Sequence, residues 1–308
     1  MRLLNTDGSR FKRNLLRDRQ LYLMLFPCIL YYILFYYVPV YGIQIAFKDY
    51  QPYVGILQSK WVGLKHFKSF FGSPYAFRII RNTFLISFYS MIFTFPLTII
   101  LALLFNELRC KWFKTAVQTI SYLPYFISTV VVAGLVVSFL SPTAGIVNTV
   151  LEKMGMEKIY FLIKPEYFRT IFVAMGGWQG IGFGTIVYTS ALCSIDNTLY
   201  EAAAVDGVSR WKRIIHITLP GIMPTIAVML IIRMGSLLSV GSESIILLYQ
   251  PITYETADVI SSYVYRNGLV ESNYSYAAAV DLFNGIISLV LVVISNMLSK
   301  KIGGSGIW

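Results

Sequence analysis

The chain alternates long apolar runs with short polar segments. A helix needs roughly 20 apolar residues to cross the hydrocarbon core of a bilayer. We predict six membrane spans, at 21–47, 80–105, 117–140, 168–192, 224–248 and 276–299. Pro27, Pro39 and Pro96 fall inside these runs, which membrane helices tolerate because neighbouring helices satisfy the freed carbonyls. The pattern therefore predicts an all-α, polytopic membrane protein with six transmembrane helices.

Two of the polar segments carry patterns of their own. Residues 61–77 mix aromatic side chains with Lys and Gly, which is typical of an interfacial segment ahead of the second span. A second segment, 143–166, has apolar residues at helical spacing. We predict that it forms an amphipathic helix on the outer face of the membrane. The apolar stripe of this helix consists of Ile146, Val147, Val150, Leu151 and Met154.

Composition agrees with a membrane protein. The chain has 308 residues, of which 56% are hydrophobic and 13% charged, whereas soluble domains carry about 25% charged residues. Mean hydropathy is +0.63 and net charge is +11. In a membrane protein this excess indicates Lys and Arg flanking the spans rather than nucleic-acid binding. The 3 irregularly spaced cysteines and 2 histidines predict neither a disulfide framework nor a metal site.

The basic residues predict the orientation. The segment 1–20 is rich in Arg and precedes an apolar run much longer than the roughly 7–15 residues of a signal-peptide core. We therefore expect the run to remain as the first span. The side that holds segment 1–20 also holds loops 106–116 and 193–223 and the C-terminal flank with Lys300 and Lys301. Together these segments carry 14 Lys and Arg, against 11 on the other side. We predict cytoplasmic termini, with a tail at 1–20, a membrane domain at 21–300 and a second tail at 301–308.

The loop YEAAAVDGVSRWKRIIHITLPGIMP, residues 200–224, is polar although it lies between two apolar runs. Residues 200–204 are strong helix formers. Asp206-Gly207 is a turn pair, because glycine takes a positive φ at little cost. Ser209 is a suitable N-cap for a second short helix. The loop is therefore expected to be a helix–turn–helix lying parallel to the membrane on its cytoplasmic side.

The second loop helix has one apolar face and one basic face. Its apolar stripe, at i, i+3, i+4 and i+7, consists of Trp211, Ile214, Ile215 and Thr218. We expect Pro220 to end this helix and Pro224 to begin the fifth span. Two interpretations stay open from the residues alone. The helix is either an interfacial one that contacts lipid phosphates or a docking surface for another protein.

Small and polar residues also occur inside the predicted spans. Gly176, Gly180 and Gly184 recur every fourth residue and fall near one helix face, where they allow close helix packing. The alternative is that they leave room for a ligand beside Trp178 and Gln179. Both interpretations are compatible.

Charged residues inside spans usually face a bundle interior or mark a site. The predicted fifth and sixth spans contain Arg233, Glu243 and Asp281, and Asn284 lies one turn after Asp281. Arg233 and Asp281 either form a structural pair between helices or belong to a binding site. Glu243 lies near the outer end, where it is expected to be solvated. Two glycines allow the fifth span to bend or unwind around a ligand, Gly235 and Gly241.

The loop motif resembles the EAA loop of binding-protein-dependent ABC importer permeases. The matching residues are Glu201, Ala202, Ala203, Asp206, Gly207, Ile217, Leu219 and Pro220. Val208 stands where the family usually has Ala, and Ile195-Asp196 stands where it usually has Ile-Pro. The segments IQIAFKDYQPY, WVGLKHF, SYLPYFIS, LLYQPITYETADVISSYVYRNGL and YSYAAAVDLFN are similar to carbohydrate-uptake permeases, especially the polysaccharide and lipo-oligosaccharide subgroup.

The resemblance implies the transmembrane domain of a type I ABC importer in a bacterial cell membrane. It implies a second homologous permease subunit, two ATPase subunits that bind ATP and Mg, and an extracytoplasmic binding protein that delivers an oligosaccharide. This chain would have no cofactor of its own. The residues expected to couple the loop 200–220 to the ATPase are Glu201, Ala202, Ala203, Asp206, Gly207, Trp211, Arg213, Leu219 and Pro220.

Sugars present C–H faces and hydroxyl edges, which aromatic surfaces with a few polar groups suit. If the resemblance holds, the substrate path therefore has seven candidates, Trp178, Gln179, Arg233, Ser236, Glu243, Asp281 and Asn284. Arg233 is the candidate partner for a carboxylate on an acidic sugar.

Other functions agree less well with the sequence. The chain has no G-x-x-x-x-G-K-[ST] motif and no H-E-x-x-H motif, so we expect neither ATP hydrolysis nor other catalysis within it. One alternative is the same architecture importing a non-sugar solute. Another is a self-contained secondary transporter, which predicts inverted repeats and no cytoplasmic docking loop; the sequence has the loop without the repeats.

Overall fold

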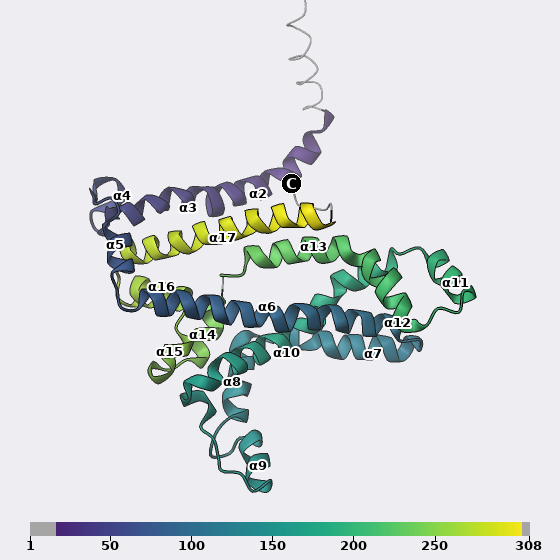
Figure 1. Cartoon of the computed structure of the whole chain (residues 1–308). Coiled ribbons are helices and arrows are strands. Elements are labelled where there is room, and N and C mark those ends of the chain that lie inside the picture. The colour runs from purple at the N-terminus through teal and green to yellow at the C-terminus, as the bar shows by residue number, and fades with distance from the viewer. Residues whose placement is uncertain (1–16, 239, 304–308) are drawn as a thin grey trace, which may run out of the picture.

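The computed structural model describes residues 17–238 and 240–303 and shows a bundle of long helices (Figure 1). Five helices are long and apolar enough to cross a membrane, Arg19–Phe47, Ala76–Glu107, Pro165–Cys193, Arg210–Gly235 and Tyr274–Leu298. A sixth span is formed if the bent pair Lys111–Phe126 and Thr129–Phe139 is counted as one. The prediction of an all-α protein with six spans is confirmed in this sense.

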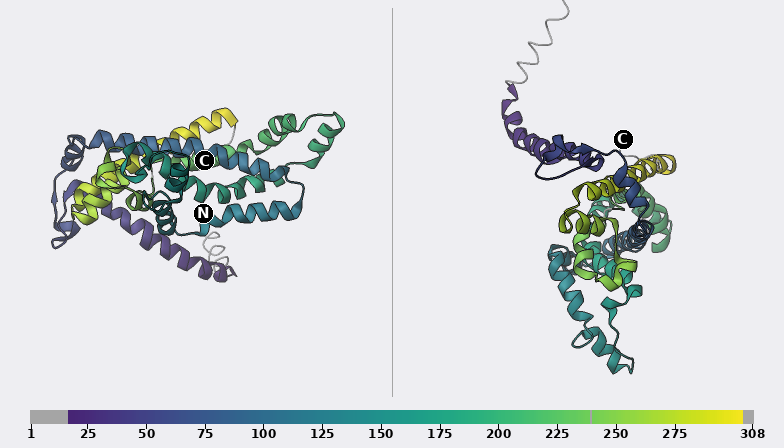
Figure 2. Two further views of the ribbon diagram at one scale, coloured as in Figure 1. Left: turned by 90° about the horizontal axis from the view of Figure 1, so that it is seen from below. Right: turned by 90° about the vertical axis from the view of Figure 1, so that its left-hand side faces the viewer.

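The first span changes helix type along its length. It comprises α2 (Arg19–Tyr32), the π-helical turn η1 (Ile33–Tyr37), α3 (Val38–Val40) and the 3₁₀ turn η2 (Tyr41–Phe47). The wider π turn ends just before Pro39, whose ring would otherwise collide with a carbonyl one turn earlier. Except near its end at η2, which contacts α17 (Tyr274–Gly303), the span is peripheral, with 0% of its apolar window buried. Figure 2 shows it along one side of the bundle.

The second and fourth spans are continuous helices that pack side by side. These are α6 (Ala76–Glu107) and α10 (Pro165–Cys193). Pro96 lies inside α6 without ending it. Their contact forms the centre of the bundle. Helix α13 (Leu219–Gly235) packs on α10, and α17 packs in turn on α13 (Figure 1).

The third span is bent rather than straight, and this corrects the prediction of one uninterrupted helix at 117–140. It consists of α7 (Lys111–Tyr122), the 3₁₀ turn η3 (Leu123–Phe126) and α8 (Thr129–Phe139), and the two halves meet at 97°. The chain leaves the helix at Ile127, which is extended. The Gln179 side chain donates a hydrogen bond of 2.8 Å to the Ile127 carbonyl. This bond satisfies a backbone group that the break would otherwise leave unpaired.

The fifth span begins earlier and ends earlier than the predicted 224–248. It runs without interruption from Arg210 to Gly235, through α12 (Arg210–Arg213), the π turn η5 (Ile214–Thr218) and α13 (Leu219–Gly235). Pro220 therefore does not end a loop helix, and Pro224 does not begin a span. As at Pro39, the π turn ends just before Pro220 and makes room for its ring.

The helix break expected from two glycines is confirmed. Helix α13 ends at Gly235, and Gly241 is the N-cap of the separate helix α14 (Ser242–Leu248). The charged residue Glu243 consequently lies on α14, beyond the fifth span. The rest of this end of the bundle is made of α4 (Gly55–Gln58), α5 (Lys65–Phe71), η6 (Pro251–Thr253), α15 (Tyr254–Ala257), α16 (Ile260–Tyr265) and η7 (Arg266–Val270).

Several short elements fill the remaining loops. A two-stranded antiparallel ribbon pairs β1 (Lys48–Asp49) with β2 (Lys60–Trp61), and Lys48 lies opposite Trp61. The predicted amphipathic helix in segment 143–166 is α9 (Ile146–Lys153), followed by the 3₁₀ turn η4 (Phe161–Ile163). It projects from the bundle (Figure 1). Asn148 holds it through side-chain bonds to the backbone of Leu140, Ser141 and Ile159.

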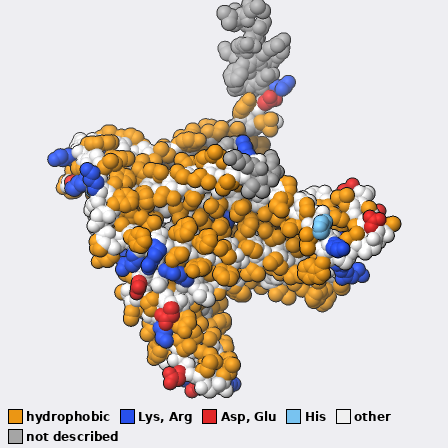
Figure 3. All heavy atoms as spheres, viewed as in Figure 1, with side chains coloured by type: hydrophobic (Ala, Val, Ile, Leu, Met, Phe, Trp, Pro, Cys, Tyr) orange, Lys and Arg blue, Asp and Glu red, His pale blue; other side chains and the backbone are white. Residues whose placement is uncertain are grey.

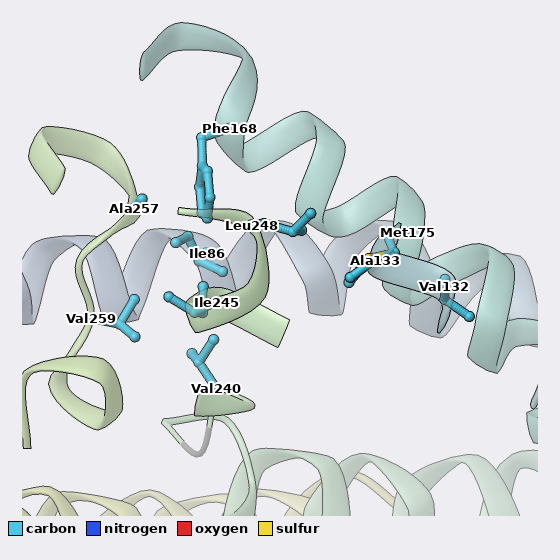
Figure 4. Close-up of a cluster of buried hydrophobic side chains, with 10 residues drawn as sticks. All are labelled: Ile86, Val132, Ala133, Phe168, Met175, Val240, Ile245, Leu248, Ala257 and Val259. Carbon is cyan, nitrogen blue, oxygen red and sulfur yellow. The ribbon is translucent and has the colours of Figure 1, made fainter. Parts of the chain in front are cut away.

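A buried apolar cluster joins the helix breaks to the main bundle. Ile86 of α6, Val132 of α8, Phe168 and Met175 of α10 and Ile245 of α14 belong to it (Figure 4). The bent third span and the short helix α14 are therefore packed parts of the fold.

Apolar side chains cover most of the long-helix surface, and charges gather at its two ends and on the α9 arm (Figure 3). One end holds α11 (Asn197–Val205) and α12, and the opposite end holds α4, α5 and α16 (Figures 1 and 2). This distribution suits a membrane-spanning bundle. Most of the tail 1–20 and residues 304–308 lie outside the described residues, so cytoplasmic termini remain a prediction.

Candidate functional site

The loop between the fourth and fifth spans begins with a capped helix. The Asp196 carboxylate accepts a hydrogen bond of 2.9 Å from the Thr198 backbone N–H and so caps α11. This bond holds the pKa of Asp196 below its usual value. The cap therefore stabilises α11 above the ordinary pKa of an aspartate, and the contribution is lost as pH falls through the lowered pKa. Asp196 therefore supplies a helix cap at the position where the EAA loop of these permeases usually has proline.

Helix α11 ends in the turn expected from Asp206-Gly207. Gly207 has a φ of 66°. The Gly207 N–H donates to the Ala204 carbonyl, and the Val208 N–H donates to the Ala203 carbonyl. These two bonds form a Schellman motif, which requires a left-handed residue at this position. The helix in 200–204 and the positive-φ glycine are both confirmed.

The turn is attached firmly to the fifth span. The Arg213 guanidinium donates a hydrogen bond of 2.8 Å to the Val208 carbonyl. The Tyr200 hydroxyl donates one of 3.0 Å to the Thr218 hydroxyl. These bonds join α11 to the first turns of the helix that continues into the membrane. Ser209 occupies the predicted N-cap position, but its side chain makes no capping bond.

The second loop helix differs from the prediction. Residues 210–218 are the first turns of the span that runs from Arg210 to Gly235, rather than a separate helix parallel to the membrane. Thr218 is buried, whereas Trp211 is 75% exposed and Ile215 is 54% exposed. The expected stripe is therefore divided between a packed side and an open side.

The loop presents an apolar tip with charges around it. Val205 is 89% exposed and projects next to the turn. Among the proposed coupling residues, Ala203 is buried, Arg213 and Leu219 are half-buried, and the others are exposed, namely Glu201, Ala202, Asp206, Gly207, Trp211 and Pro220. Exposed apolar groups rimmed by polar ones are typical of a protein contact. The geometry favours docking over the lipid-contact interpretation, because the loop extends beyond the bundle (Figure 1).

A central cavity of about 510 Å³ lies between α6, α10 and α13. This size falls in the range of roughly 300–1,000 Å³ typical of ligand sites. Its α6 wall carries four hydroxyls, from Ser87, Ser90, Thr94 and Thr98. Arg233 and Ser236 contribute from the end of α13 and the residue after it.

The glycine stripe of α10 forms part of the cavity wall. A Cβ atom at Gly176 or at Gly180 would meet nothing within 4 Å, and both glycines line the cavity. Gly184 does pack, since its Cβ would lie 3.0 Å from Thr98. The closest helix approach is at Gly182 instead, where a Cβ would overlap the Ser121 carbonyl of α7. Of the two interpretations of this stripe, room for a ligand therefore applies to Gly176 and Gly180.

Arg233 faces the cavity, and no carboxylate among the described residues pairs with it. Its guanidinium donates a hydrogen bond of 3.4 Å to the Thr94 hydroxyl, and the Ser236 hydroxyl bonds the Arg233 carbonyl. The ion pairs among residues 17–238 and 240–303 do not include one between Arg233 and Asp281. The alternative of a structural pair between these residues is therefore wrong.

The remaining path candidates lie away from the central cavity. Gln179 lines a second cavity of about 550 Å³, which meets the central one at Gly176 and Gly180. Trp178 lines a groove of about 630 Å³ between α6 and α10. The last three do not line any of these cavities, exposed Glu243 on α14, exposed Asp281 on α17 and buried Asn284 on α17.

Two features escaped the prediction. The hydroxyl stripe on α6 was readable as polar residues at i, i+3, i+7 and i+11 in an apolar run.

The other missed feature is a network around Asp258, which is 0% exposed. Arg266 donates a hydrogen bond of 2.7 Å to Asp258, and Arg78 of α6 approaches it to 3.9 Å. No sequence pattern reveals this network, because Arg78 lies far from Asp258 in the chain.

The Asp258 network fastens the α16 end of the bundle. Asn82 of α6 donates hydrogen bonds to the backbone carbonyls of Glu255 and Asp258, and it accepts one from Arg169 of α10. The Arg266 guanidinium also stacks over the Tyr254 ring, 4.6 Å from its centre. The 249–275 segment is therefore held to both long central helices.

Comparison with known proteins agrees with this architecture. Residues 94–303 match the family described as "Binding-protein-dependent transport system inner membrane component". Protein LplB of Bacillus subtilis is 40% identical and aligns over 98% of this chain and 95% of its own length. The "Polygalacturonan/rhamnogalacturonan transport system permease protein YteP" of the same organism is 42% identical. It aligns over 97% of this chain and 94% of its own length.

Solved structures show the same fold. A chain in the crystal structure of a bacterial ABC transporter that imports "the acidic polysaccharide alginate" superposes with a TM-score of 0.88 and 49% identity, covering 96% of this chain and 99% of that one. A chain of the alginate transporter bound to an "alginate pentasaccharide-bound periplasmic protein" superposes with a TM-score of 0.89 and 48% identity. The match covers 97% of this chain and 100% of that one. This chain therefore belongs to the family of inner-membrane components of binding-protein-dependent transport systems, and it is a multi-pass permease subunit of an ABC importer rather than an enzyme.

Proposed function

We propose that this permease imports an oligosaccharide across a bacterial inner membrane. The observation that carries the proposal is the central cavity, in which hydroxyls, an arginine and two open glycines face a common space between spans. Hydroxyl and guanidinium groups suit the polar edges of sugars, and glycines leave room for their rings. The polysaccharide named for the YteP relative and for the alginate transporter supports the same class of substrate.

The chain works within a larger assembly in this proposal. An extracytoplasmic binding protein delivers the sugar, as the periplasmic protein of the alginate transporter suggests. A second homologous permease completes the passage, and two ATPase subunits that bind ATP and Mg dock at the loop 200–220. The exposed tip formed by Val205 and Trp211 suits such docking. ATP hydrolysis is assigned to those partner chains.

The continuous fifth span provides a direct mechanical link. Arg210 lies in the loop and Arg233 faces the cavity, and one helix joins them. At 1.5 Å per residue this is about 35 Å. A movement of the loop therefore shifts the cavity wall, and the break at 236–241 allows the helix to move relative to α14. Each bound partner biases this change only by its different affinity for the two states.

Filling the cavity tests the proposed path. We expect Gly180→Leu to fold, because its Cβ meets nothing within 4 Å, but to lower uptake by at least about tenfold. A side chain that overfills a packed site typically costs about 1–3 kcal/mol, and here that cost falls on substrate binding. The measurement is uptake of labelled oligosaccharide by proteoliposomes that contain both permeases, the ATPases and the loaded binding protein.

Gly134→Leu is the matched control. Gly134 lies in α8 with nothing within 4 Å of its Cβ, and it does not line the central cavity. Uptake by this variant should equal that of the wild type. Equal uptake by both variants would contradict the proposed path. If the wild-type assembly accumulates only a non-sugar solute, or transports without any ATPase, the oligosaccharide-importer proposal itself fails.

A further inference from the structure

The four hydroxyls on α6 form a continuous polar stripe along the central cavity. Ser87, Ser90, Thr94 and Thr98 follow one another at intervals of three and four residues, which keeps them on one helix face. The other residues of this helix between 84 and 105 are apolar or aromatic. The stripe extends over about three helical turns, roughly 16 Å. It is long enough to contact more than one group of a bound molecule.

Ser87 is the member that most clearly lacks a hydrogen-bond partner in the described part of the chain. It is 6% exposed, yet its hydroxyl oxygen is buried without a hydrogen-bond partner among the described residues. Buried hydroxyls are normally bonded, because leaving one unpaired costs free energy. Since Ser87 lines the cavity, a ligand that enters the cavity can supply the missing bond.

The threonines present a different chemistry to the cavity. The Thr94 hydroxyl donates to the Ser90 carbonyl and the Thr98 hydroxyl donates to the Thr94 carbonyl, each at 2.7 Å. Their hydrogens are used within the helix, so their oxygens offer acceptor positions to a ligand. Sugar hydroxyls, which donate and accept, match a wall that combines such acceptors with the free Ser87 hydroxyl.

Arg233 adds a positive charge opposite this stripe. Its guanidinium contacts Thr94 of the stripe, and it forms no ion pair with a described carboxylate. A guanidinium has five donors in a planar fork that fits a carboxylate through two parallel bonds. One contact of 3.4 Å with a hydroxyl leaves most of these donors free for a ligand.

We propose that the α6 stripe and Arg233 together form a subsite for a sugar acid in the permease, with the sugar carboxylate on Arg233 and its ring hydroxyls on Ser87 and Thr98. This inference rests on the proposed function and names its substrate class. The ring lies against Gly176 and Gly180, where no side chain occupies the space. Ser87 and Thr98 thereby become residues that determine specificity.

The test uses the purified assembly of both permeases and the ATPases without the binding protein, so that only the permease site is measured. The probes are trigalacturonate and the same trisaccharide with its carboxylates methyl-esterified. Binding is followed by saturation-transfer NMR titration in detergent. We expect the wild type to bind the acid at least about tenfold more tightly than the ester, as a charged bidentate pair provides.

The variants separate recognition from folding. Arg233→Gln should remove the preference for the acid, and Arg233→Lys should restore part of it.

Ser87→Ala and Thr98→Val should weaken the binding of both probes by a few fold. Ser87→Ala should leave the thermal unfolding midpoint unchanged, because its hydroxyl has no hydrogen-bond partner among the described residues to lose. Thr189→Val is the control and should bind like the wild type, since its hydroxyl also bonds its own helix but does not line the cavity.

Two results would overturn the subsite. One is equal binding of acid and ester by the wild type, and the other is an unchanged preference in Arg233→Gln. Wild-type proteoliposomes supplied with loaded binding protein provide the separate check on the proposed function. Uptake of a neutral oligosaccharide with no preference for the acid in binding would reject the sugar-acid subsite while leaving oligosaccharide import intact.

Discussion

Replacing Gly207 with proline is expected to abolish most uptake and most substrate-stimulated ATP hydrolysis. Gly207 has a φ of 66°, whereas proline is fixed at about −65°. Proline also lacks the N–H that bonds the Ala204 carbonyl. The Schellman turn cannot form, so the angle between α11 and the fifth span is lost. Because this turn joins the docking tip to the helix that carries Arg233, the loss uncouples the ATPase from the cavity.

A graded series makes this prediction specific. Gly207→Ala places a side chain in the left-handed region at a cost of about 1–2 kcal/mol and should give intermediate uptake. Gly207→Asn should stay close to the wild type, because asparagine tolerates this conformation. Sugar affinity of the isolated binding protein is unaffected by definition and serves as the internal control. Normal coupled transport by Gly207→Pro would show that the turn does not transmit the movement.

Replacing Asp258 with alanine is expected to destabilise the folded chain by about 3–5 kcal/mol, the usual cost of removing one partner from a buried ion pair. Asp258 is 0% exposed and is contacted by Arg266 at 2.7 Å and by the Ser262 hydroxyl at 2.8 Å. The variant leaves the Arg266 and Arg78 charges without their carboxylate. The measurement is the midpoint of thermal unfolding of the purified permease in detergent.

A surface pair provides the matched control. Lys158 and Glu152 form an ion pair of 3.2 Å, but their side chains are 42% and 62% exposed. Glu152→Ala should therefore change stability by at most about 1 kcal/mol. Asp258→Asn, which keeps the size and part of the hydrogen bonding, should fall between the two. An Asp258→Ala midpoint equal to that of Glu152→Ala would show that the network does not fasten the α16 end.

The predictions that rested on local backbone chemistry were confirmed. The turn at Gly207 follows from the cost of a positive φ, which two neighbouring residues decide. The break between Gly235 and Gly241 likewise follows from glycine content in a predicted span. The helices at 146–153 and 200–204 follow from spacing and propensity, since each is a short segment read over its own length.

The predictions that failed required knowledge of neighbours. Pro220 was expected to end a helix, but a π turn before it accommodates the ring and the helix continues. The third span was expected to be straight, but Gln179 from another helix satisfies the carbonyl at a break. Asp281 was considered as a partner for Arg233, yet it does not face the same cavity. The last two outcomes depend on residues far apart in the chain, whereas the π turn lies directly before Pro220.

By itself the sequence determined the membrane class, the approximate places of the spans, the turn in the loop and the family resemblance. These properties depend on composition, on hydrophobic runs of the length of a bilayer, and on residues close together in the chain. Only the tertiary structure decided which polar groups share a space. It placed the α6 hydroxyls opposite Arg233, opened Gly176 and Gly180 to a cavity, and buried Asp258 between two arginines. Helix packing sets these positions, because which face of each span turns inward depends on all its neighbours at once.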